Sequence, residues 1–365
     1  MTPADLEGAT VLVTGGTGSL GQTLVRRLLT GEMGAPHQII VFSRDEAKQY
    51  AMKTQWKHAH KPTDEIIYHN FDELIEFRIG DVRDYASVED AVLAADVVFH
   101  AAAMKQVPTC EYFPTQAVAT NVLGAENVVR AARRSERTHT VLAISTDKAC
   151  KPINVMGMTK ALQERIVVEG NLQQEHCRML AVRYGNVLSS RGSVIPLFKD
   201  QIARGGPVTI TLPEMTRFLL SLDSAVDTIF AGYRAGRRGE IFVPQVQAAR
   251  IPDVAETMIA GRPIETIVTG IRPGEKVHEV LVSEEEAHRT TERAGHYVVG
   301  PALPELRADE EPAVLTGEYC SADAVVTGAE LEALVAQADW VDPAMGETGA
   351  ANGQAAEAAA GDRRP

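Results

Sequence analysis

An apolar run that ends in spaced glycines restricts most what this chain can fold into. Residues 10–14, TVLVT, are typical of a buried parallel strand, and TGGTGSLG follows at once and leads into the helical stretch QTLVRRLLTG. In such a strand–turn–helix unit, backbone amides and the helix N-terminus can hold a pyrophosphate. The GxxGxxG pattern therefore predicts a dinucleotide site. The residues expected to form it are Gly15, Thr17, Gly18, Ser19, Leu20 and Gly21.

Strands and helices alternate along the rest of the first half. Further strands are expected at 38–43, 75–81, 95–103, 140–146 and 178–187, with helical segments between them. This alternation predicts an α/β fold with a doubly wound parallel sheet of the Rossmann type.

From about residue 187 the alternation loosens, which indicates a second, smaller C-terminal lobe for a substrate. We expect the dinucleotide-binding unit to cover 8–187 with a returning segment at about 222–245, and the lobe to cover 188–221 and 246–342. The tail, 343–365, is rich in alanine and glycine and is expected to be disordered.

The charge of the chain excludes some partners. With 36 Lys and Arg against 49 Asp and Glu, the net charge is −13. This balance argues against nucleic acid and anionic membrane surfaces, because both are bound through many basic residues. We find no charged, apolar leader and no apolar run of about 18 residues, so we expect a cytoplasmic protein that does not enter a membrane.

The cysteines and histidines do not form a metal-binding pattern. Four scattered cysteines without a CxxC pair favour reduced, structural thiols: Cys110, Cys150, Cys177 and Cys320. His58 and His60 in WKHAHKP fit a solvated loop. No metal is therefore expected.

The end of the second expected strand bears on the choice of cofactor. An acidic residue there would accept the ribose 2′-hydroxyl of NAD, whereas FSRDEAKQY offers Ser43, Arg44 and Lys48, a hydroxyl and two cations that suit a 2′-phosphate. NADP is therefore favoured over NAD. Two alternatives stay open: Arg44 and Lys48 are solvated surface charges, or Asp45 accepts the ribose 2′-hydroxyl of NAD. Later strand ends are expected to add Asp81, Val82, Ala101, Ala102 and Ala103 to the cofactor site.

The segment STDKACKPINVMGMTKAL combines a polar strand end with an MxxxK spacing. Lys160 stands four residues after Met156, on the same face of an expected helix. Thr146, Asp147 and Lys148 supply a hydroxyl, a carboxyl and an amine where doubly wound folds place their sites. Alone, these residues fit equally well a turn in which Asp147 caps a helix and Lys148 is solvated. The glycine pattern and Lys160 favour the catalytic interpretation.

Together these motifs resemble a known group of enzymes. TGxxGxxG, HAAA, STDK, MxxxK, RYGNVLSSRGSVIP and RPGEK follow one another, over roughly residues 8–285, as in the extended short-chain dehydrogenase/reductase superfamily. More narrowly, the chain is similar to the UDP-N-acetylglucosamine 4,6-dehydratases that invert C5, of the flagellin-glycosylation and capsular-polysaccharide type. Met156 stands where the superfamily has a proton-transferring tyrosine, and one subset of this group shares that methionine.

The resemblance implies hydride removal from C4, proton abstraction at C5, loss of the C6 hydroxyl and hydride return to C6. We interpret Lys148 as the C5 base, because a lysine whose pKa is lowered toward neutrality by desolvation is a competent base. Asp147 is then the acid for the C6 hydroxyl, with Thr146 as its hydrogen-bond partner, and Lys160 holds the nicotinamide ribose. Lys148, Lys160 and a water chain remain options for the C4 hydroxyl proton.

A UDP-sugar substrate needs contacts to two phosphates and a ribose diol. The resemblance implies that Arg272 grips the diphosphate and that Glu275 accepts the ribose hydroxyls. It also implies a homo-oligomer. Further substrate contacts are expected from Lys105, Asn186, Arg191, Lys199 and Arg217.

Other functions on the same scaffold stay open. A C4 epimerase normally retains the tyrosine and has no use for an acid and a base at C5 and C6, and a 5,6-dehydratase would release an alkene. A non-enzymatic NADP-binding sensor would have little reason to keep Asp147, Lys148 and Lys160 together.

Overall fold

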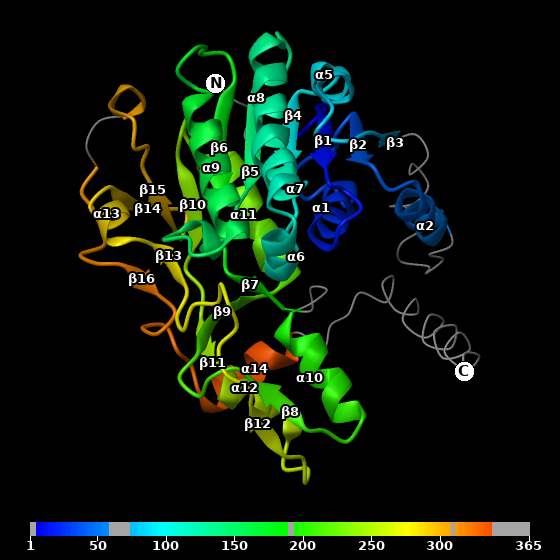
Figure 1. Cartoon of the computed structure of the whole chain (residues 1–365). Coiled ribbons are helices and arrows are strands. Elements are labelled where there is room, and N and C mark those ends of the chain that lie inside the picture. The colour runs from blue at the N-terminus through cyan, green and yellow to red at the C-terminus, as the bar shows by residue number, and fades with distance from the viewer. Residues whose placement is uncertain (1–4, 58–73, 189–192, 308–310, 338–365) are drawn as a thin grey trace.

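A large, mostly parallel sheet forms the centre of the protein (Figure 1). The computed structural model describes residues 5–57, 74–188, 193–307 and 311–337. Within them, nine strands lie in the order β14, β15, β10, β6, β5, β4, β1, β2, β3. The strands from β10 to β3 run parallel, and β15 and β14 are antiparallel additions at one edge. Their bounds are β1 Thr10–Thr14, β2 Gln38–Ser43, β3 Ile75–Ile79, β4 Val97–His100, β5 Thr140–Ile144, β6 Arg178–Val182, β10 Ile241–Pro244, β14 Thr290–Arg293 and β15 His296–Val299.

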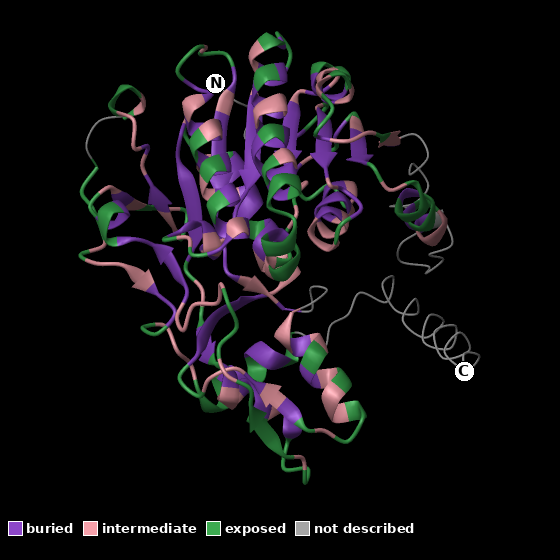
Figure 2. Cartoon of the chain, in the orientation of Figure 1, coloured by how far each residue is buried: buried purple, intermediate pink, exposed green. Residues whose placement is uncertain are grey.

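The strands alternate their side chains between two apolar cores. Val11 and Val13 of β1 pack in one core with helices α1 (Ser19–Leu29) and α11 (Leu222–Ala235), whereas Leu12 packs in the other. Because helices cover both faces, both faces of the strands are buried and their sequences are continuous apolar runs (Figure 2). The predicted doubly wound fold is confirmed. The helices of the second face are α5 Tyr85–Leu93, α8 Gly124–Arg134 and α9 Val155–Glu169.

A smaller lobe lies beyond the carboxyl ends of the parallel strands (Figure 1). Its apolar core is formed mainly by the helices α10 Val194–Ala203, α12 Ile251–Ile259 and α14 Gly328–Ala336. Three small sheets accompany them: β7 Asn186–Val187 with β9 Thr216–Leu220 and β11 Ala248–Arg250; β8 Val208–Ile210 with β12 Thr266–Val268; and β13 Val280–Val282 with β16 Tyr319–Cys320.

The remaining described elements are short or peripheral. One of them is a π-helix, η1, between α7 and α8. Their bounds are α2 Glu46–Lys57, α6 Val107–Tyr112, α7 Pro114–Ala117, η1 Val118–Leu123, η2 Asp147–Ala149, α13 Glu284–Ala287 and η3 Pro304–Leu306.

Two features differ from the sequence prediction. The strand expected at 178–187 is split, because the chain leaves the central sheet after β6 and β7 pairs with β9 instead. Gly185 permits this crossing, since a Cβ there would lie 2.5 Å from the Cβ of Phe218. Strands β14 and β15 extend the central sheet, although they fall in the range expected for the lobe. The tail, 343–365, lies outside the described residues.

Across the described ranges, no helix is both long and apolar enough to cross a membrane. Within the same ranges, no three His, Cys, Asp or Glu residues gather as metal ligands, and His58 and His60 fall outside them. The four cysteines are buried and free.

Candidate active site

The glycine turn between β1 and α1 lies against the end of β4. Gly15 has a left-handed backbone, with φ +69°, and a Cβ there would lie 2.8 Å from the backbone of Ala102. A Cβ on Gly21 would lie 2.5 Å from the carbonyl oxygen of Gly15, so glycine lets α1 approach the turn. Gly18 caps α1 without a side-chain hydrogen bond, which leaves the first helix amides for a ligand. The turn brings together the predicted cofactor residues Gly15, Thr17, Gly18, Ser19, Leu20, Gly21, Ala101, Ala102 and Ala103.

At the end of β2, one of the three expected selectivity residues, Arg44, lies beside Asp81. The guanidinium of Arg44 is largely exposed and lies 3.9 Å from the Asp81 carboxylate. Lys48 is engaged in an exposed ion pair with a neighbouring aspartate. Ser43 is buried, and its hydroxyl accepts a hydrogen bond from Gln49 Nε2 at 3.1 Å. The structure thus brings Arg44 and Asp81 together and engages Ser43 and Lys48 elsewhere.

Two residues that the sequence analysis did not single out fix the end of β3. Arg83 donates to the carboxylate of Asp81, and these bonds keep the pKa of Asp81 below its ordinary value. Asn127 Nδ2 on α8 donates to the carbonyl oxygen of Val82 at 2.9 Å. Both contacts position the strand end expected near the adenine.

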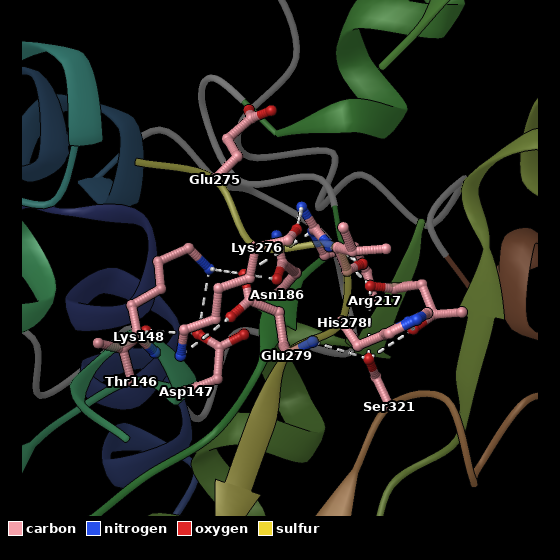
Figure 3. A network of polar contacts seen from close by, with 12 residues as sticks. Thr146, Asp147, Lys148, Asn186, Arg217, Glu275, Lys276, His278, Glu279 and Ser321 are labelled. Atoms are coloured by element: carbon pink, nitrogen blue, oxygen red, sulfur yellow. Dashed lines mark hydrogen bonds and ion pairs between the residues drawn. The ribbon is translucent and has the colours of Figure 1, made fainter. Parts of the chain in front are cut away.

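The turn after β5 gathers Thr146, Asp147 and Lys148 in one polar cluster (Figure 3). Thr146 caps the 3₁₀ turn η2 and donates its hydroxyl to Asp147 Oδ1 at 2.7 Å. Lys148 Nζ donates to Asp147 Oδ1 at 3.1 Å and to Asn186 Oδ1 at 3.5 Å, and it lies 3.4 Å from Glu279 Oε1. Asp147 is fully buried and the Lys148 side chain is 20% exposed. The alternative of a solvated Lys148 beside a helix-capping Asp147 is therefore wrong.

The charges in this cluster set the protonation state of Lys148. Burial alone favours the neutral amine, but the negative charges of Asp147 and Glu279 outweigh it and raise the pKa of Lys148 above its ordinary value. The pKa lowering expected from the sequence is therefore wrong for this arrangement, and Lys148 rests as an ammonium ion. Burial also raises the pKa of Glu279. Among the described residues, Asp147 Oδ2 and Glu279 Oε2 find no hydrogen-bond partner.

Lys160 on α9 lies in a different environment. It is buried, and its Nζ donates to the carbonyl oxygen of Ile144 at 2.5 Å and to Gln163 Oε1 at 2.7 Å. Burial, only partly offset by one nearby carboxylate, lowers the pKa of Lys160 to about 7. The neutral form of this lysine is therefore accessible near neutral pH.

Met156 lies in an apolar pocket on the first turn of α9. Its neighbours are Cys110 and Ala117, with Met104 and Val107 partly buried against them. A thioether packed in this way has no proton to exchange. The pocket explains how methionine is accommodated but gives it no acid–base role.

Arg217, an expected substrate contact, is turned into the protein. Its guanidinium donates to the carbonyl oxygens of Thr216, Lys276 and Val277, and its Nε lies 3.8 Å from Glu279 Oε1. In this arrangement it holds the segment before β13. A substrate contact by Arg217 stays a prediction.

The other expected substrate residues are dispersed around the cluster. Arg272 and Glu275 share one turn, in which the Arg272 amide donates to Glu275 Oε2 at 3.4 Å, and Figure 3 shows Glu275 apart from η2. Arg272 is exposed, as is Lys105 just after β4. Lys199 is partly buried on α10, and Arg191 lies outside the described residues.

Lys276 and Glu279 complete the cluster, although the sequence analysis passed over them. Lys276 Nζ donates to the carbonyl oxygen of Cys150 at 2.6 Å and lies 3.9 Å from Glu279 Oε2. The available signal was a glutamate placed directly before the apolar run VLV, because charged residues are rarely buried without a partner.

Comparison with known proteins places the chain in a family. The family model described as polysaccharide biosynthesis protein matches residues 11–301. The chain belongs to this family. It is 44% identical over 293 residues to a protein of Rickettsia typhi named UDP-glucose 4-epimerase, a match that covers 79% of this chain and 82% of that relative. The Rickettsia prowazekii protein of the same name matches equally well.

Solved structures of the family's fold agree with this assignment. The X-ray structure of Pen from Bacillus thuringiensis has a TM-score of 0.80 and 30% identity, over 91% of this chain and 98% of that one. DesIV, a dTDP-glucose 4,6-dehydratase from Streptomyces venezuelae with NAD and TYD bound, has a TM-score of 0.62 and 19% identity, over 73% and 86% of the two chains. The second likeness shows the fold alone.

Proposed function

We propose that the protein is a UDP-sugar-modifying enzyme with a nicotinamide cofactor, and that it catalyses the 4,6-dehydration of UDP-N-acetylglucosamine with inversion at C5. The observation that carries this proposal is the buried pair of Asp147 and Lys148, joined at 3.1 Å beyond the end of β5. Proton abstraction at C5 and loss of the C6 hydroxyl require a base and an acid at neighbouring atoms. Membership of a polysaccharide biosynthesis family supports a sugar substrate.

The residues of the glycine turn fit a dinucleotide. Side chains at Gly15 or Gly21 would fill the turn, and the amides at the start of α1 are available for a pyrophosphate. We propose NADP, with Arg44 at the 2′-phosphate; the NAD in the DesIV structure makes NAD the alternative. When bound, the cofactor supplies the hydride acceptor for C4 and the donor for C6.

We propose that one proton moves within the catalytic pair before the chemistry begins. Transfer of a proton from Lys148 Nζ to the Asp147 carboxylate turns the resting ion pair into a neutral amine and a neutral carboxyl group. The amine then takes the proton from C5, and the carboxyl protonates the departing C6 hydroxyl. Exclusion of water by a bound substrate favours this transfer, because a drier site penalises separated charges. After both steps the resting ion pair is restored. Hydride return to C6 is then completed by a proton from solvent that reaches C5, and inversion requires this proton to arrive on the face of the sugar opposite Lys148.

Lys160 is our candidate for the C4 hydroxyl proton. Lys148 rests already protonated, whereas Lys160 has a pKa of about 7 and therefore holds neutral and protonated forms together at neutral pH. Its two hydrogen bonds go to uncharged oxygens, which do not stabilise the protonated form as a carboxylate would.

A C4 epimerase is the second candidate, because relatives 44% identical to the chain are named UDP-glucose 4-epimerase. Incubation with UDP-N-acetylglucosamine, and separately with UDP-glucose, in deuterated water separates the candidates by NMR of the product. A dehydratase gives a 4-keto sugar with a C6 methyl group and deuterium at C5. An epimerase gives the C4 epimer without deuterium at C5, and an alkene at C5–C6 indicates a 5,6-dehydratase.

If both substrates stay unchanged although the cofactor is bound, the result favours a non-enzymatic NADP-binding sensor. A homo-oligomer and a cytoplasmic location stay predictions from the sequence.

A further inference from the structure

Glu279 stands at the centre of three cations that come from different parts of the chain. Its carboxylate lies 3.4 Å from Lys148 Nζ, 3.8 Å from Arg217 Nε and 3.9 Å from Lys276 Nζ (Figure 3). The side chain is 2% exposed. A carboxylate buried to this extent is costly unless it is paired, so these cations are what make its charge tolerable.

The backbone on both sides of the carboxylate is fixed. The Glu279 amide donates to Ser321 Oγ at 2.9 Å, and the Glu279 carbonyl oxygen accepts from the Ser321 amide at 2.8 Å. The same serine hydroxyl shares a hydrogen bond of 2.6 Å with Thr216 Oγ1 on β9. The backbone that carries the carboxylate is therefore held by contacts that do not involve Lys148.

We infer that Glu279 is a positioning residue for Lys148, a second carboxylate that holds the amine beside Asp147 from the opposite side of the site. The effect of Glu279 on catalysis rests on the proposed function. The contact between Glu279 and Lys148 does not depend on that function. Asp147 reaches Nζ from the same turn, whereas Glu279 reaches it from the segment that follows the RPGEK motif. Two carboxylates from different parts of the chain thus hold the amine, together with the weaker contact to Asn186 Oδ1 at 3.5 Å.

The charged groups around Lys148 determine what loss of Glu279 would do. The amine faces Asp147 on its own turn, Glu279 before β13 and Arg217 on β9. Lys276 faces Glu279, and Lys160 on the adjacent α9 donates elsewhere. Without the charge of Glu279, burial and the nearby guanidinium both favour the neutral amine. The pKa of Lys148 should therefore fall.

Glu279→Gln tests this inference, because it keeps the shape of the side chain and removes its charge. Lysines methylated with ¹³C-formaldehyde are titrated by NMR in the cofactor-bound protein, and Lys148→Arg assigns the Lys148 signal. We expect its midpoint to fall by about one pH unit or more, a tenfold or greater change in proton affinity. In unmodified enzyme, the basic limb of kcat/KM, where Lys148 loses the proton that it passes to Asp147, should move to lower pH. The value of kcat should fall about tenfold, less than the 10²–10⁴-fold loss typical of a removed acid or base, because the amine is misplaced and not removed.

Glu284→Gln is the matched control. Its carboxylate is 71% exposed and pairs with Lys151 at 3.5 Å, so the variant removes a glutamate charge from a lysine pair at the surface. Both the Lys148 titration and the pH profile should stay as in the wild type.

Glu279→Asp keeps the charge but withdraws it by one methylene, so the titration midpoint of Lys148 should fall by less than in Glu279→Gln. It provides the test if the glutamine variant does not fold. A Lys148 midpoint that is the same in wild type and in a folded variant would overturn the inference, as would a lower kcat with an unmoved basic limb. If the wild type leaves UDP-N-acetylglucosamine unchanged, the proposed function fails, and the NMR titration still decides whether Glu279 positions Lys148.

Discussion

At the level of single residues, Lys148 and Met156 give the sharpest comparison. Lys148→Ala removes the amine, so turnover and deuterium exchange at C5 should fall by about 10²–10⁴-fold. Met156→Ala removes a thioether packed among apolar side chains, so we expect a loss of about 2–5 kcal/mol in the free energy of unfolding with turnover largely retained. Urea unfolding and turnover at saturating cofactor measure both, with Met156→Leu as the volume-matched control. Near-normal C5 exchange in Lys148→Ala would make the lysine a bystander.

The exposed guanidinium of Arg44 carries the prediction about the cofactor. Arg44→Asp should weaken NADP binding by roughly 2 kcal/mol or more and leave NAD binding intact, because only NADP has the 2′-phosphate that a carboxylate repels. Calorimetric titration of both cofactors measures the difference. Arg204→Asp, on an exposed arginine after α10, is the control and should change neither affinity. If Arg44→Asp weakens the binding of NADP and NAD equally, Arg44 does not determine which of the two cofactors the protein prefers.

The sequence predicted residues of the candidate site but not their surroundings. Local patterns, taken together with the family resemblance, pointed to Asp147, Lys148 and Lys160, because strand ends and helix faces follow from local patterns. The raised pKa of Lys148 depends on Asp147 and also on Glu279, which lies far along the chain and is held by contacts in the lobe. Local patterns do not encode such a partner.

At the level of elements, the approach of α9 to η2 depends on one glycine. A Cβ on Gly157 would collide with the carbonyl oxygen of Lys148. The Gly157 amide also donates the hydrogen bond to Asn154 Oδ1 by which Asn154 caps α9. Gly157→Ala should therefore separate the helix from η2, cost about 1–3 kcal/mol of stability and, if the proposed function holds, lower kcat. Thermal unfolding and turnover check this. The neighbouring Met158→Ala, at a half-exposed position, should leave kcat unchanged; equal kcat in both variants would show that the close approach is dispensable.

The elements themselves were the most predictable part of the fold. Buried strands flanked by glycine and polar turns were placed correctly because helices on both faces make them continuous apolar runs. The errors concern pairing: β7 leaves the central sheet for β9, and β14 and β15 join it. Which edge a short strand joins depends on contacts between distant segments, and its own composition does not reveal them.

At the scale of the whole molecule, a buried ion network ties the central sheet to the C-terminal segment. Arg183, after β6, donates to both carboxylate oxygens of Glu164 on α9 and of Glu286 on α13. Ser145, two residues before η2, donates its hydroxyl to the Glu164 carboxylate at 2.5 Å. Arg183 also donates to the carbonyl oxygen of Leu281 on β13. The two sides of the candidate site are thus joined through one guanidinium.

Removal of that guanidinium leads to a prediction about stability and pH. Burial alone would raise the pKa of Glu286, but the charge and hydrogen bonds of Arg183 outweigh it and lower the pKa to about 2. A carboxyl group with a depressed pKa contributes stability that is complete above its unfolded value near 4.5 and is lost as the pH falls toward 2. Arg183→Met removes the cation shared by two buried carboxylates and leaves Glu286 with Arg289, 3.9 Å away, so at pH 7 it should cost about 3–5 kcal/mol of unfolding free energy.

The difference between wild type and Arg183→Met should then shrink as the pH falls toward 3.5. The carboxylates of the variant, which lack Arg183, take up protons as the pH falls, whereas below about 4.5 the unfolded wild type binds a proton that folded Glu286 does not, which lowers the stability of the wild type. Urea unfolding of both proteins between pH 7 and pH 3.5 measures this. Arg137→Met, which removes a half-exposed guanidinium from its pair with Asp96, is the control and should cost at most about 1 kcal/mol. A difference that stays constant from pH 7 to pH 3.5 would mean that Arg183 stabilises the fold by packing and not by holding the carboxylates ionised.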